Sequence, residues 1–107
     1  MVRLIESIDP TAVKLKKLAI DGIQNTIKYE ITCKVTYDKD KQLTAESEIG
    51  ESIQSYTSHN PDIGLVLKTF GSDEITLNLS VPNDTHDIQQ FVVNLLSELL
   101  DDCENIH

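Results

Sequence analysis

The alternation of apolar and polar positions is most regular between Ile27 and Tyr37. In this stretch every odd-numbered residue is apolar or aromatic, and every even-numbered residue is polar or charged. Successive side chains of a strand point to opposite faces, so the pattern predicts a long antiparallel strand with one apolar and one polar face. The parity extends back to Ile23, where this strand can begin. We expect its polar face to stay hydrated or to meet a partner.

A second alternating stretch runs from Leu43 to Ile49 and predicts a second strand. Pairing Tyr37 with Leu43 across a five-residue polar loop would place the apolar residues of both stretches on one face. The same register would set Lys34 opposite Glu46, a cross-strand pair contributing roughly 0.2–1 kcal/mol. The pattern therefore predicts a β-hairpin over residues 37–43.

The first twenty residues admit two interpretations. Residues 1–8 fit either a strand or a helix. From Pro10 to Ile20, Asp9 as N-cap and Gly22 after the last turn would frame a helix. Alternatively, the alternation around residues 13–16 favours a strand, and Asp21-Gly22 between apolar runs is typical of a hairpin turn. Both interpretations stay open at this point.

The C-terminal half begins with a stretch that has no clear period, residues 51–64. It predicts either a long functional connection or a short helical turn that brings Ile53 and Tyr56 to the core. Residues 65–70 and 75–81 then predict two further strands, and Pro82 ends the second.

A helix is predicted from Asn83 or Asp84 onward, capped by Asp84 or Thr85. Its apolar residues spread over about 180° of the helix, wider than the stripe of a surface helix. The set comprises Ile88, Phe91, Val92, Leu95, Leu96, Leu99, Leu100 and Cys103. One sheet face would cover only part of this stripe, which predicts a second covering element or a second copy of the chain.

Together these elements predict one α+β domain over residues 1–107. Its antiparallel sheet has four to five strands, and the C-terminal amphipathic helix covers one face. No apolar run approaches the ~20 residues of a membrane span, and no signal peptide is apparent. Cys33 and Cys103 fit no metal or redox spacing. We therefore expect a cytoplasmic protein without membrane contact.

Charge is distributed unevenly along the chain. The formal net charge is −9, which disfavours direct nucleic-acid binding. Residues 69–107 carry eight acids and no lysine or arginine, whereas residues 1–68 carry ten acids and nine bases. The last turns of the predicted helix hold Glu98, Asp101, Asp102 and Glu104, although acids at a helix C-terminus are unfavourable by about 0.3–1 kcal/mol each. This conflict predicts a partner-facing acidic patch, with a solvated tail as the alternative.

Candidate chemistry is sparse. The three histidines lack metal-ligand spacing, and no phosphate-binding loop is present, so we expect no catalytic, cofactor or metal site. Tyr56 and His59, in the 51–64 stretch, join the acidic patch as candidate partner-binding residues. The sequence favours a non-catalytic acidic protein–protein interaction module that self-associates and binds a basic protein surface. The alternatives are an acidic inhibitor that mimics nucleic acid, a component of a phage or other particle, and a small enzyme or ligand-binding protein.

Overall fold

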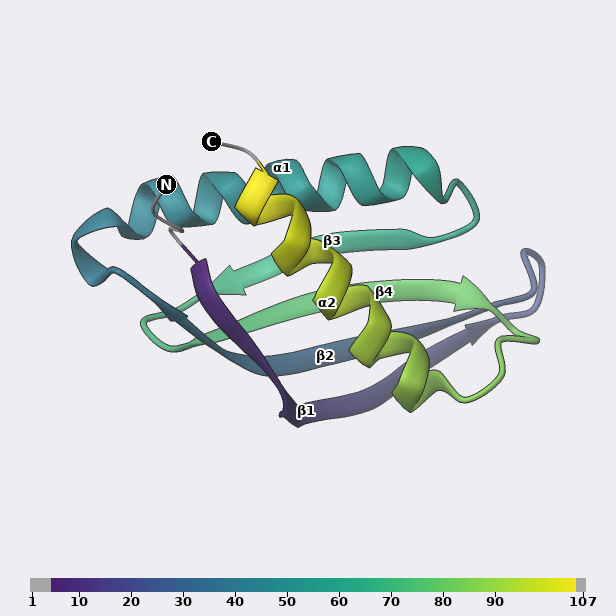
Figure 1. The fold of residues 1–107 in the computed structure, drawn as a ribbon. Helices are drawn as coiled ribbons and strands as arrows, with labels where there is room; N and C mark the ends of the chain where they lie inside the picture. The colour runs from purple at the N-terminus through teal and green to yellow at the C-terminus, as the bar shows by residue number, and fades with distance from the viewer. Residues whose placement is uncertain (1–4, 106–107) are drawn as a thin grey trace.

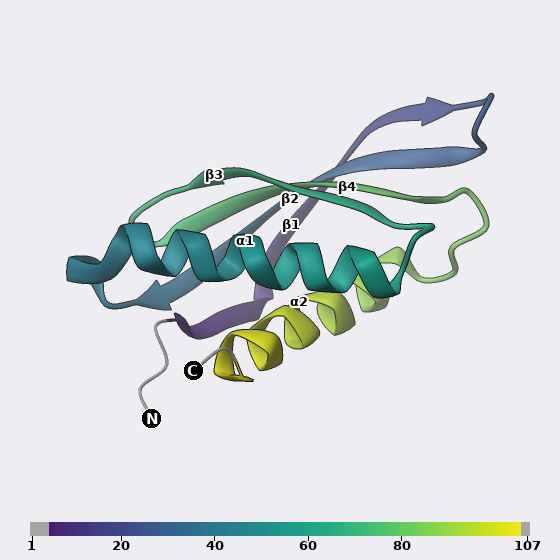
Figure 2. The ribbon, with the colours of Figure 1, turned by 90° about the horizontal axis from the view of Figure 1, so that it is seen from above.

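The computed structural model describes the backbone of residues 5–105 and the side chains of residues 13–99. The described chain forms a four-stranded antiparallel sheet of order β1-β2-β4-β3 and two long α-helices (Figure 1). Both helices lie on the same side of the sheet (Figure 2). In chain order the elements are β1 (Ile5–Asp21), β2 (Thr26–Tyr37), the 3-10 turn η1 (Lys39–Lys41), α1 (Gln42–His59), β3 (Gly64–Phe70), β4 (Glu74–Pro82) and α2 (Ile88–Asn105). The prediction of an α+β fold with an antiparallel sheet is confirmed.

Strand β2 is the predicted alternating strand, and it begins at Thr26 rather than near Ile23. It lies inside the sheet and pairs with β1 on one side and β4 on the other. Its register with β4 places Ile31 opposite Leu77 and Cys33 opposite Ile75, and all four side chains are buried. The predicted apolar face of β2 is therefore the core face of the sheet.

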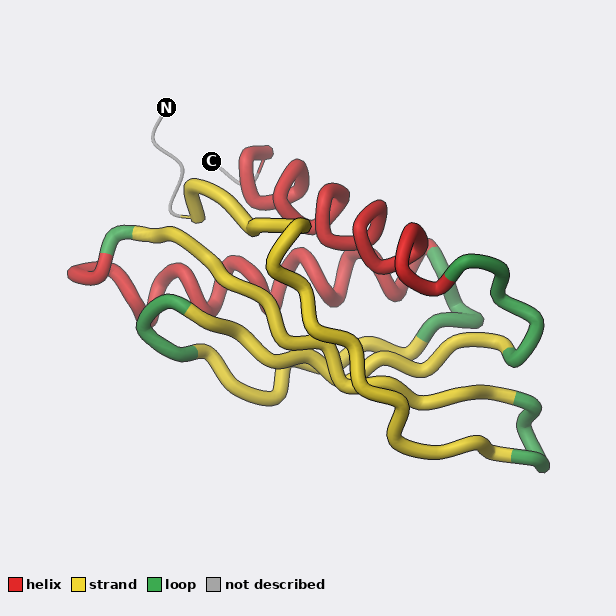
Figure 3. Tube along the Cα trace, turned by 90° about the horizontal axis from the view of Figure 1, so that it is seen from below, coloured by secondary structure: helices red, strands yellow, loops and turns green. Residues whose placement is uncertain are grey.

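Residues 10–20 form a strand, so the helical alternative for this segment is wrong. Asp21 closes the turn between β1 and β2, because its carboxylate accepts hydrogen bonds from the backbone amides of Ile23 at 3.0 Å and Gln24 at 3.1 Å. Asn25 follows with φ 56°, a left-handed conformation that asparagine tolerates better than most residues. Strand β1 changes direction along its length (Figure 3), where its register with β2 jumps between Asp9 and Lys14.

The predicted hairpin over residues 37–43 is wrong, because Gln42–His59 is the helix α1. Lys34 does not face Glu46; in the sheet it stands opposite Glu74 of β4. The buried residues of α1 recur every three or four positions: Ala45, Glu48, Ile49, Ser52, Ile53 and Tyr56. A spacing of four fits both a strand and a helix over a short stretch, so residues 43–49 alone could not separate the two.

The 51–64 stretch is not a structureless connection. Its first nine residues belong to α1, and its last residue opens β3. A short turn joins the two elements, in which the backbone amide of Ile63 donates to the carbonyl of Asn60 at 3.0 Å. Ile53 and Tyr56 do reach the core, on a long helix rather than on a single helical turn.

Helix α2 begins at Ile88, later than predicted. Its N-cap is Asp87 rather than Asp84 or Thr85, since the Asp87 carboxylate accepts a hydrogen bond from the backbone amide of Gln90 at 3.2 Å. Val92, Leu95, Leu96 and Leu99 are fully buried, and α2 packs against both β1 and α1. Leu100 and Cys103 of the predicted stripe lie outside the residues whose side chains are described. The second covering element is therefore α1, and the breadth of the stripe gives no separate reason for a second copy.

The structure predicts a large loss of stability on truncating one apolar residue of α1 and almost none on truncating another. Ile49 is buried, so Ile49→Ala should lower the free energy of unfolding by about 2–5 kcal/mol. Leu43 is 82% exposed, so Leu43→Ala should change it by less than about 0.5 kcal/mol. In the discarded hairpin both residues would lie on the apolar face. Equal losses in urea unfolding of the two variants would contradict the helix.

Cys33 should be chemically silent in the folded protein. Burial, with a smaller contribution from the negative charge of Glu74, raises the pKa of its thiol to about 12. Because the thiolate is the reactive form, native Cys33 should resist Ellman's reagent at mild alkaline pH and react at once in denaturant. The measurement uses a Cys103→Ser variant so that only one thiol is counted. Rapid labelling of the native variant would contradict the burial of Cys33.

Candidate functional site

The predicted acidic patch is described at one of its four positions. Glu98 is exposed on α2, whereas Asp101, Asp102 and Glu104 continue the same helix but lie outside the residues whose side chains are described. The side of the sheet on which both helices lie is acidic in sequence. Helix α1 contains three acids and α2 four, and neither contains lysine or arginine. We call the exposed faces of α1 and α2 the acidic helical side.

Tyr56 and His59 occupy different environments on α1. Tyr56 is buried between the helices, and its burial raises the pKa of the phenol, with a further contribution from the negative charge of Glu98. The fold thus brings two of the predicted residues close together. His59 is exposed, and its Nδ1 lies 2.8 Å from the carbonyl oxygen of Ser55. The same carbonyl accepts a hydrogen bond from Ser58 Oγ at 2.8 Å, so the contact of His59 is local to the last turn of α1.

The other side of the sheet, away from the helices, gathers lysines from three strands. The register places Lys14 and Lys16 of β1 opposite Thr32 and Glu30 of β2, on the polar side of that strand. We call the set the lysine face: Lys14, Lys16, Lys28, Lys34 and Lys68, all exposed. The described acids on this side are Glu30, Glu74 and Asp21, which stands opposite Thr26 at the end of the sheet. Five lysines against three carboxylates make the open side of an acidic protein locally positive.

An ion pair ties the lysine face together across the sheet. Lys68 Nζ lies 2.7 Å from Glu30 Oε2, so the side chain of β3 reaches over β4 to β2. The hydrogen bond and the charge of Lys68, followed by the charge of Lys16, lower the pKa of Glu30. Glu30 is therefore paired with Lys68 and is also influenced by the charge of Lys16, so lysines from both edges of the sheet act on it.

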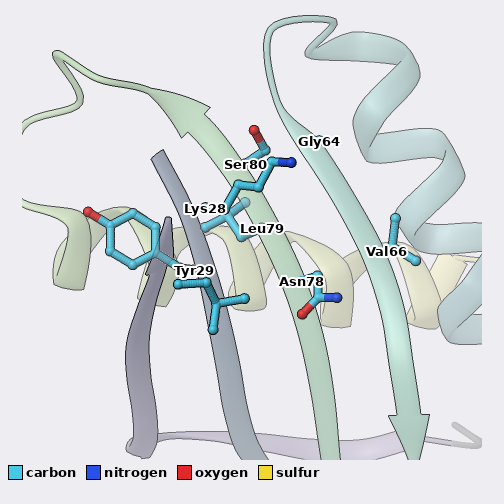
Figure 4. A pocket seen from close by; sticks show the side chains of 8 residues that line it. Lys28, Tyr29, Gly64, Val66, Asn78, Leu79 and Ser80 are labelled. Carbon is cyan, nitrogen blue, oxygen red and sulfur yellow. The ribbon is translucent and has the colours of Figure 1, made fainter. Parts of the chain in front are cut away.

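A groove of about 250 Å³ opens on the same side of the sheet, beside the lysine face (Figure 4). It is lined by Leu18, Lys28, Tyr29, Gly64, Val66, Asn78, Leu79 and Ser80. Gly64 keeps it open, because a Cβ at that position would stand 3.2 Å from the Cβ of Ser80. Asn78 Oδ1 is buried beside the groove and accepts no hydrogen bond from the described residues.

Exposed apolar side chains cluster around the groove and the adjoining β1–β2 hairpin. Val66 is 62% exposed and Leu18 47%, and both line the groove. Ile20 and Ile23 are also exposed, near the hairpin turn that projects beyond the helical layer (Figure 2), but the register of Ile20 with Ile27 places Ile20 on the opposite side of the sheet from the groove. Apolar residues rimmed by charged ones are typical of surfaces that bind other macromolecules.

Sequence reasoning missed the lysine face. Lys14 and Lys16 were visible as a basic cluster, and Lys28 and Lys34 as the polar side of β2, but their common face depends on which strands are neighbours. The signal available in the sequence was the alternation with a period of two in the segments that became β1 and β2, which places the lysines of each strand on one face. Lys68, 38 residues from Glu30 in the chain, could be placed only by the sheet order.

Comparison with known proteins gives no relative: no family model, curated protein or solved structure matches the chain significantly. Within residues 5–105, no helix is long and apolar enough to cross a membrane. The described side chains also include no group of three or more His, Cys, Asp or Glu residues placed to hold a metal ion. The surfaces described above are therefore the basis for a functional proposal.

The ion pair predicts how Glu30 titrates. Because Lys68 lowers the pKa of Glu30, the pair stabilises the fold above the ordinary glutamate pKa, and this contribution is lost as pH falls through the lowered value. Lys68→Met should move the Glu30 pKa upward, measured from its side-chain carbon shift by NMR. The control is Lys34→Met, because Lys34 belongs to the same face but its charge does not contribute to the shift of the Glu30 pKa. An unchanged Glu30 pKa in the Lys68 variant would refute the pair.

Proposed function

We propose that the protein is a non-catalytic interaction module that binds other polypeptides through two faces of opposite charge. The observation that carries this proposal is the open side of the sheet. The apolar side chains of β2 and β4 are buried and the two helices lie on that side of the sheet, whereas the opposite side presents the lysine face, a groove and the exposed side chains of Leu18 and Val66. Such a combination of apolar contacts within a charged rim favours protein–protein binding.

The two faces suit different partner surfaces. The acidic helical side, with Glu98 exposed and three more acids following along α2, favours a partner with a basic surface. The lysine face favours acidic polypeptide. A nucleic acid fits the lysine face poorly, since it would find no described aromatic side chain fully exposed for base stacking: Tyr37, Tyr56 and Phe70 are buried, and Tyr29 and Phe91 are half-buried. Mimicry of nucleic acid and assembly into a larger particle stay predictions from the sequence.

Affinity capture from the native cell tests the module. The wild-type protein should retain specific partners at about 0.05 M salt and release them at about 0.5 M, because charge complementarity is screened by added ions. A bait with Lys16→Glu and Lys28→Glu should lose partners of the lysine face and keep those of the acidic helical side. A matched control bait carries Lys39→Glu and Lys41→Glu, which change the net charge equally but lie on η1. Identical recoveries by the wild-type and a denatured bait would overturn the proposal.

A further inference from the structure

We propose that copies of this protein associate head to tail, with the lysine face of one copy receiving the acidic helical side of the next. The inference rests on the proposed function and names the partner of the lysine face as a second copy of the chain. Its basis is that one molecule carries both halves of a complementary contact on opposite sides of one sheet (Figure 2).

The separation of charge selects this geometry over a symmetric dimer. A two-fold contact uses the same surface on both copies. Two sheet sides in contact would oppose two surfaces that each carry more lysines than acids, and two helical sides would bring the carboxylates of α1 and α2 together. Like charges placed against each other cost binding free energy, whereas the head-to-tail contact opposes lysines to carboxylates.

The outer face of α1 has the chemistry that the groove requires. Its exposed residues include Glu46 and Glu51, which would meet the lysines, and hydroxyl and amide donors at Ser47, Gln54 and Ser55. Such donors suit the polar part of the groove lining, at Asn78 and Ser80. Leu18 and Val66, at the rim of the groove, would lose water on docking.

The test measures mass against concentration for three proteins. The wild-type at about 0.05 M salt should show a rising mass in light scattering, and about 0.5 M salt should reduce its association at least about tenfold. A lysine-face variant (Lys16→Glu, Lys28→Glu) and an acidic-side variant (Glu46→Lys, Glu51→Lys, Glu98→Lys) should each be monomeric alone. All five positions are exposed, so both variants should fold, which circular dichroism checks.

Mixing the two variants provides the decisive result. Each retains the face that the other lacks, so the mixture should regain the association that each variant alone has lost. The η1 variant (Lys39→Glu, Lys41→Glu) should associate like the wild-type. A wild-type that stays monomeric at low salt overturns the inference. So does association that survives both variants, or a mixture that stays monomeric.

These outcomes separate the inference from the proposed function. If the wild-type is monomeric but the native cell yields partners that the lysine-face variant loses, the module stands and its partner is another protein. If a single-stranded oligonucleotide competes for the lysine face and no polypeptide is retained, both proposals fail and the face is a nucleic-acid site.

Discussion

The antiparallel pairing of β2 on both of its sides is the constraint on which the rest of this structure depends. Because side chains alternate along a strand, fixing the register of β2 sends Ile31, Cys33 and Val35 into the core, where Leu77 and Ile75 of β4 stand opposite the first two. The same register turns Lys28 and Lys34 to the open side, beside the lysines of β1 and β3. One set of backbone hydrogen bonds thus determines both where the helices pack and where positive charge collects.

Sequence patterns predicted the elements whose period is unambiguous over their length. β2, β3, β4 and α2 were recovered with errors at their ends, whereas the β1–β2 hairpin at Asp21 was one of two interpretations that the sequence left open. The strand predicted for residues 43–49 is wrong because Ala45 and Ile49 are four residues apart, a spacing found both on one face of a strand and on one turn of a helix. Extending the window to Ile53 and Tyr56 restores the helical period, since the next intervals are four and three residues.

The surface properties were less accessible than the fold, because they depend on which strands are neighbours. The acidity of the C-terminal third is a local feature, so it could be read directly from the chain. The lysine face is assembled from β1, β2 and β3, and its central ion pair joins β2 to β3 across β4. The broad stripe of α2 suggested a partner for a reason that the structure removes, since α1 packs against it.

A formal charge of −9 describes this protein poorly at the distances over which partners bind. The molecule measures 43 × 25 × 20 Å, whereas electrostatic screening acts within about 8 Å at physiological ionic strength. A surface docked on the open side of the sheet therefore interacts with the lysines there and only weakly with the carboxylates beyond the helical layer. In the proposed head-to-tail association, long-range repulsion between two copies would slow their encounter, and the complementary faces would govern the contact once it is made.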